Sequence, residues 1–164
     1  IMNRADVTTE YRRPVAPALA RAEETGGPAV AIELPDGRIV TGKTTKLLGA
    51  SAAALLNALK VLGDINDELH LLPPVVIEPL SRLKTHQLGG HNPRLHADEI
   101  LIALSISATT NPLAARAMKQ LEGLRGSEAH STVIVSGVDS GIYRKLGINL
   151  TMEPEYQTKK LYHG

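Results

Sequence analysis

Apolar and polar residues change their spacing several times along this chain, and the changes divide it into alternating strands and helices. Residues 29–34 and 38–41 are two β-rich runs separated by Pro-Asp-Gly, a combination that predicts a β-hairpin. Short apolar or β-branched runs at 69–72, 132–136 and 148–151 predict three more strands.

Apolar residues that recur every three or four positions predict helices before and between these strands. The predicted helices span 6–25, 46–62, 75–88 and 139–146, and prolines are expected to bend the first and the third. A helical hairpin is expected at about 92–124.

Each helix of this hairpin is expected to start at an Asn-Pro pair, Asn92-Pro93 for the first and Asn111-Pro112 for the second. Asn can cap exposed backbone N–H groups, and Pro at the first helical position lacks a donor that would have no partner there. The first helix is apolar on almost every side, so most of its surface is expected to be buried.

This alternation predicts an α/β fold, with a mixed sheet and helices on both faces, into which the helical hairpin is inserted. The order of elements matches the cytidine-deaminase-like arrangement, as a fold-level analogy. Gly26-Gly27-Pro28 is the best candidate for a boundary. Residues 1–26 are then a helical lead-in or the remnant of a preceding domain, and residues 27–164 form the α/β domain.

Composition narrows the classes of function. The net charge is +1, and with four Tyr, no Phe and no Trp the chain offers few platforms for base stacking, so nucleic-acid binding is not expected. The absence of Cys fits a reducing compartment and a cytoplasmic protein. The longest apolar run, at 100–104, is too short to span a membrane, and no signal peptide precedes it. The chain begins in the middle of a pattern at Ile1, which suggests a piece of a longer protein.

The segment from Gly37 to Thr44 satisfies the phosphate-loop pattern G-x-x-x-x-G-K-[ST]. A phosphate loop needs a flexible run of backbone amides there, whereas residues 38–41 are β-branched and follow a turn, so we interpret them as a strand. Lys43 and Thr44, ahead of the next helix, remain candidates for contact with an anion.

Metal chemistry has little support. A zinc deaminase needs ligands at the starts of two helices, and residues 42–45 and 73–76, which occupy those places, contain none. His86, His91 and His96 lie close in sequence but lack the spacing of a zincin pair. We therefore expect no bound zinc.

A polar segment at 125–131 combines residue types that transfer protons and donate hydrogen bonds. Its candidates for ligand binding are Arg125, Glu128, His130 and Ser131. The favoured interpretation is a turn whose polar groups satisfy the backbone ahead of a buried strand, and the alternative is a relay of functional side chains.

Distinctive blocks of sequence lie at residues 33–43, 92–112, 124–136, 146–149 and 153–162. Together they resemble the C-terminal part of an uncharacterised bacterial family, catalogued as domain of unknown function 1846. Members of that family are longer, which implies that this chain is a C-terminal piece. Their glycine-rich, phosphate-loop-like segment lies in the N-terminal part and has no counterpart here, so any nucleotide is expected to bind only with that missing part. The resemblance supplies no catalytic residue and leaves the cofactor unknown.

Two functional hypotheses follow. The first is a packing or oligomerisation domain that contacts the missing N-terminal part of the protein, or a second copy, and completes a site between domains. The alternative is an enzyme domain that binds a small anionic or nucleotide-like ligand. Its site would combine Lys43 and Thr44 with Ser136 and Asp139, because strand ends that precede helices share one edge of such a sheet.

Overall fold

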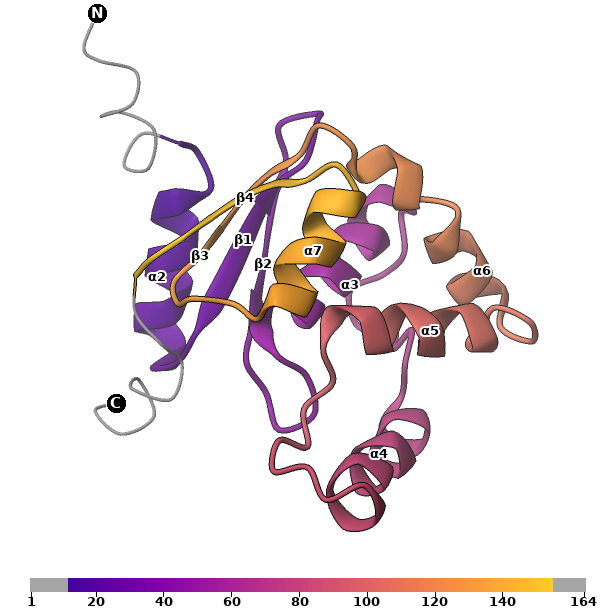
Figure 1. Cartoon of the computed structure of the whole chain (residues 1–164). Coiled ribbons are helices and arrows are strands. Elements are labelled where there is room, and N and C mark those ends of the chain that lie inside the picture. The colour runs from indigo at the N-terminus through magenta and orange to yellow at the C-terminus, as the bar shows by residue number, and fades with distance from the viewer. Residues whose placement is uncertain (1–11, 155–164) are drawn as a thin grey trace, which may run out of the picture.

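A mixed four-stranded sheet forms the centre of the computed structural model, which describes residues 12–154 (Figure 1). The strands are β1 (Ala29–Glu33), β2 (Ile39–Lys43), β3 (Glu128–Ser131) and β4 (Asn149–Met152), and their order in the sheet is β2-β1-β3-β4. β1 is antiparallel to both β2 and β3, while β3 and β4 are parallel. The α/β class, the mixed sheet and the hairpin are therefore confirmed.

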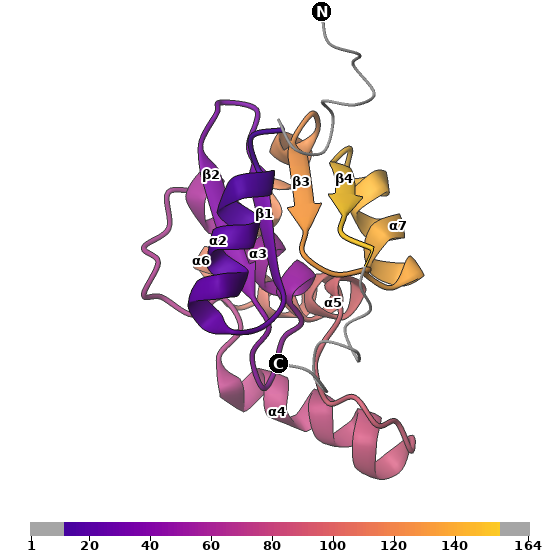
Figure 2. The ribbon, with the colours of Figure 1, turned by 90° about the vertical axis from the view of Figure 1, so that its left-hand side faces the viewer.

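Helices cover both faces of this sheet (Figure 2). The helices are α2 (Val15–Thr25), α3 (Ala50–Leu62), α4 (Pro74–Arg82), the π-helix η1 (Leu83–Gln87), α5 (Ala97–Ser107), α6 (Pro112–Met118), the 3-10 helix η2 (Leu121–Leu124) and α7 (Gly137–Lys145). α2 lies on one face, and α3 and α7 lie on the other. Within residues 12–154, no helix combines the length and apolar character that a membrane crossing requires.

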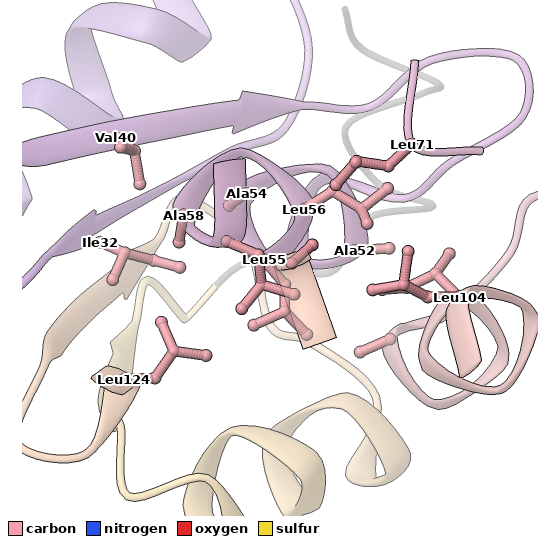
Figure 3. Close-up of a cluster of buried hydrophobic side chains, with 14 of the residues drawn as sticks. Ile32, Val40, Ala52, Ala54, Leu55, Leu56, Ala58, Leu71, Leu104 and Leu124 are labelled. Atoms are coloured by element: carbon pink, nitrogen blue, oxygen red, sulfur yellow. The ribbon is translucent and has the colours of Figure 1, made fainter. Parts of the chain in front are cut away.

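The core lies between the sheet and α3, the most apolar helix of this face (Figure 3). Leu55 and Leu59 of α3 are fully buried, and so is Ile32 of β1. The helix approaches β2 so closely that a Cβ atom on Gly42 would lie 2.2 Å from the backbone nitrogen of Ala54. Only glycine fits at this contact, so packing explains the second glycine of the phosphate-loop pattern.

The strand predicted at 69–72 was wrong. This segment is irregular, yet Leu71 and Leu72 are buried and belong to the core. Figure 3 shows Leu71 beside α3, near Leu56. These apolar residues cover a helix and do not pair in the sheet. A short apolar run in the sequence cannot distinguish these two arrangements.

The strand predicted at 132–136 was also wrong, because β3 occupies the preceding, mostly polar residues 128–131. The Ser131 hydroxyl donates to the Val133 carbonyl (2.7 Å) and accepts from the Val133 N–H (3.3 Å), which turns the chain out of the sheet. The segment interpreted as a polar turn is thus largely a strand, and the β-branched residues after it form the connection to α7.

The helical hairpin is confirmed in outline and differs at its start. Asn111 caps α6 as expected, with its side chain accepting from the Leu113 N–H (2.9 Å). α5, however, begins at Ala97 rather than at Asn92. It also leaves Ile102 and Ile106 60% and 66% exposed, so the prediction of a helix buried on most sides was wrong.

The helix predicted at 6–25 begins at Val15 within the described residues, and residues 6–11 lie outside them. α3 begins at Ala50, four residues later than predicted. The helix predicted at 75–88 is present as α4 followed by η1, with Pro79 inside α4. The division of the chain at residue 26 stays a prediction.

Candidate functional site

Three helices begin at one small cavity beside the sheet. The cavity has a volume of about 70 Å³ and is lined by the first residues of α3, the residue before α5, and the residues that open α7. Its polar side chains are Ser51, Asn92, Arg94, His96, Ser131, Ser136 and Asp139. Ser131 ends β3, so the cavity lies at the carboxyl end of that strand, the usual side for a ligand in α/β sheets.

Asp139 is the central group of this site. Its carboxylate accepts from the Ser51 hydroxyl and from the Ala97 backbone N–H (2.9 Å), and it lies 3.8 Å from Nδ1 of His96. One side chain of α7 therefore connects the starts of α3 and α5. Burial alone would raise the pKa of Asp139, but His96 and the two hydrogen bonds outweigh it and hold the pKa below 3.8.

His96 immediately precedes α5 and is only partly buried. The nearby carboxylate of Asp139 raises the pKa of His96 above 6.5, although burial and the charge of Lys84 oppose the shift. The Glu99 side chain accepts from the His96 backbone N–H (2.8 Å), which fixes the start of the helix. A buried aspartate beside a partly exposed imidazole can hold a proton on the histidine near neutral pH.

Tyr143 follows Asp139 by one helical turn and fixes the same part of α3. Its hydroxyl donates to the Ser51 carbonyl (2.7 Å), and the side chain is fully buried. Burial, and then the charge of Asp139, raise the pKa of Tyr143 well above 10.0, so the phenol remains a neutral donor. This arrangement fixes the position of Ser51 at the cavity.

Arg94 brings a permanent positive charge to the cavity wall. Its Nε donates to the Thr45 carbonyl (2.5 Å), and the neighbouring Leu95 pairs with the chain just before α3 through backbone hydrogen bonds to Leu47 and Gly49 (2.8 and 3.2 Å). The first amides of each helix lack acceptors within the helix, and the helix dipole makes that end positive. The cavity thus combines one carboxylate with a guanidinium, an imidazole and three positive helix ends.

The residues predicted from sequence fall into three groups. Ser131, Ser136 and Asp139 line the cavity. Lys43 pairs with Ala29 at the same edge of the sheet, but neither Lys43 nor Thr44 lines the cavity.

Arg125, Glu128 and His130 lie away from this cavity. Arg125, which lies just before β3, is exposed and packs against Gly147. Glu128 and His130 project from alternate positions of β3 and join a separate polar cluster.

That cluster connects β3 and β4 to the chain ahead of α2. His130 is fully buried; its Nδ1 lies 2.7 Å from the Thr151 hydroxyl and its Nε2 lies 2.6 Å from the Glu153 carboxylate. Arg12 donates to Glu128 (2.5 Å) and to the Asn149 carbonyl (2.8 Å). His130 thus bonds across strands, neither to its own segment nor into the cavity.

Sequence reasoning missed four residues of the cavity, namely Ser51, Asn92, Arg94 and His96. His96 was considered only as a metal ligand, because the helix start was placed at Asn92. The signal that could have identified it is Glu99, three residues later, since a residue before a helix is often bonded by a glutamate at that spacing.

Comparison with protein families matches residues 10–162 to the family described as domain of unknown function DUF1846, C-terminal. Among individual proteins, UPF0371 proteins of Streptococcus pneumoniae (strain Hungary19A-6) and Streptococcus thermophilus (strain CNRZ 1066) are both 54% identical over 162 residues. Each alignment covers 99% of this chain and 33% of the relative. The chain therefore spans about a third of the length of the curated relatives it matches.

Proposed function

This chain belongs to the DUF1846 family as its C-terminal domain, and from that premise we propose that it forms one wall of a binding site for a small anionic group. The group is of the phosphate or carboxylate class, and it binds in the cavity where α3, α5 and α7 begin. The preceding part of the longer protein closes the open side of this site.

The observation that carries the proposal is the convergence of positive groups on one cavity. Arg94 and His96 line it together with the starts of three helices. Helix starts favour anions, and Arg presents donors in a fork that matches phosphate and carboxylate oxygens.

The carboxylate of Asp139 does not cancel this preference. It already has the Ser51 hydroxyl, the Ala97 N–H and the His96 imidazole as partners, so its charge is largely compensated. The Asp139 N–H donates to the Ser136 hydroxyl (3.1 Å) and Arg94 Nε to the Thr45 carbonyl, which leaves the other guanidinium N–H groups of Arg94 and the remaining first amides of α3 and α7 to meet a ligand. Protonated His96, held by Asp139, adds to the positive side and could pass a proton to a bound group.

The packing hypothesis fits the same geometry. The chain covers a third of the length of its relatives, as expected for one domain of a protein about three times as long. A cavity open to the exterior at the strand ends is a place where a preceding domain can contribute groups of its own. The expected homo-oligomer stays a prediction, which light scattering of the full-length protein would check.

The test is a calorimetric titration of the full-length protein with inorganic phosphate. Arg94→Ala and His96→Gln are each expected to weaken binding about tenfold, because each removes a charge-assisted contact. Lys43→Ala is the matched control: it removes an exposed cation at the same edge of the sheet, outside the cavity, and should leave the affinity unchanged.

Two results would contradict the proposal. One is the absence of saturable phosphate or carboxylate binding by the full-length protein. The other is an equal loss of affinity in Lys43→Ala and Arg94→Ala, which would mean that general surface charge, rather than the cavity, attracts the anion.

A further inference from the structure

The arm formed by α4 and η1 (residues 74–87) extends away from the sheet and its covering helices (Figures 1 and 2). Its inner side is anchored by Ile77, which is buried in the core. The outer side carries Val75, Pro79 and Leu83 at successive intervals of four residues, which places them in one stripe along the helix. Val75 and Leu83 are 76% and 41% exposed.

This outer side is hollowed as well as apolar. A depression of about 300 Å³ is lined by Pro79, Arg82, Leu83, His86 and Gln87. An amphipathic helix normally turns one apolar stripe inward and keeps the other side polar. The arm has apolar residues on both sides, and the outer stripe, flanked by Arg82 and His86, has no partner within residues 12–154.

The arm also has little intrinsic stability as a helix. Pro79 removes one backbone hydrogen bond from its interior, and five residues follow in a π-helix, a rare form that often lies at functional sites. Helices this short depend on packing for their stability. A surface that covers the outer stripe would supply it.

We infer that the outer side of this arm is the docking surface for the preceding part of the same, longer polypeptide. The length of the relatives supports this occupant: the chain matches a C-terminal domain and covers a third of their length, so about two thirds of such a polypeptide is available to dock on it. Apolar contact with Val75, Pro79 and Leu83, and acidic groups opposite Arg82 and His86, would complete the interface. The inference rests on different residues from the anion site, because none of these residues lines that cavity.

A cross-linking experiment on the full-length protein identifies the occupant. Any cysteine of the preceding part is first replaced by serine, since these 164 residues contain none, and Leu83→Cys is then labelled with a benzophenone maleimide and illuminated. The expected product has the mass of the monomer, with cross-linked peptides from the preceding part of the chain. Leu19→Cys, an exposed leucine on α2 across the sheet, is the matched control for background. A product with the mass of a dimer, cross-links confined to residues 12–154, or equal yield from Leu19→Cys would overturn the inference.

Hydrogen exchange provides a second measurement. In the full-length protein, Val75→Glu together with Leu83→Glu should speed amide exchange in the arm and in the facing segment at least about tenfold, while β1 and β3 keep their protection. Both substituted side chains are exposed in this domain, so its own fold should persist. Unchanged exchange in the doubly substituted protein would overturn the inference, whether or not phosphate binds.

Discussion

His130 shows how a polar residue can belong to the interior of a sheet. It has zero exposed surface, and both ring nitrogens have partners on the next strand or just beyond it, Thr151 and Glu153. Burying a polar side chain costs little when each of its groups is paired, and it costs much more when one partner is removed. Stability, rather than ligand binding, is therefore where a change at His130 should appear.

His130→Ala is expected to lower the free energy of unfolding by about 2–4 kcal/mol, through an unfilled volume and two lost hydrogen bonds. Urea denaturation followed by circular dichroism measures this change. His70→Ala, at an exposed histidine, is the control and should change stability little. Unchanged stability with loss of phosphate binding would instead assign His130 to a site.

His96 should make the stability of the protein depend on pH near neutrality. Because Asp139 raises its pKa above 6.5 in the folded state, its contribution is complete below about pH 6.5 and is lost as the pH rises through the folded pKa. Asp139, whose pKa lies below 3.8, contributes above that value and loses its contribution as the pH falls through its folded pKa.

His96→Gln should therefore flatten the decline in unfolding free energy between about pH 6 and 8. The effect should stay below about 1 kcal/mol, because the side chain is about one third exposed and solvent screens the pair. Denaturation at a series of pH values, with His70→Gln as the control, measures it. Parallel curves for the His96 variant and the unsubstituted protein would show that the pair does not contribute.

At the scale of elements, β2 and α3 pack so closely at Gly42 that no side chain fits between them. Gly42→Ala should destabilise the domain by at least about 2 kcal/mol, because the added methyl group overlaps the backbone of Ala54 and α3 must move. Gly27→Ala is the matched control: its Cβ would meet no atom within 4 Å and its φ is not positive, so little change is expected. Thermal unfolding of the two variants compares them, and equal melting temperatures would mean that α3 shifts without cost.

The same contact shows what sequence patterns can and cannot predict here. The Pro-Asp-Gly turn and the β-branched residues of β2 were enough to predict the hairpin, and they favoured a strand over a phosphate loop at residues 38–41. Leu71 and Glu128 could not be placed that way, because a strand is defined by the partner it pairs with. The apolar run at Leu71 covers α3, whereas the polar run at Glu128 pairs with β1.

The candidate site was predictable only in part, for a related reason. Ser136 and Asp139 were expected because they follow a strand and open a helix. Arg94 and His96 reach the same place because the chain at Leu95 pairs with the chain before α3, an isolated bridge between segments 47 residues apart. The local sequence pattern around His96 does not predict the pairing of Leu95 with the chain before α3.

At the scale of the whole molecule, Lys84 joins the arm to the cavity. Its ammonium donates to the Arg94 carbonyl (2.6 Å) and to the Glu99 carboxylate (2.9 Å), the group that also accepts from the His96 backbone. One side chain of the arm thus contacts the two segments that present Arg94 and His96. The proposed docking surface and the proposed anion site share a mechanical connection.

Such a connection obliges the two equilibria to influence each other by the same factor. If docking steadies the arm and so improves phosphate affinity several-fold, phosphate must in turn favour the docked arrangement by that ratio. Lys84→Met should reduce the factor toward one in both directions. The coupling factor can be measured in a double-mutant cycle that combines Lys84→Met with the paired substitutions Val75→Glu and Leu83→Glu. Calorimetry gives the phosphate affinity, and amide exchange rates give the stability of the docked arm. In the full-length protein, binding of an anion in the cavity would then change how firmly the other two thirds of the chain dock on the arm, through the single ammonium group of Lys84.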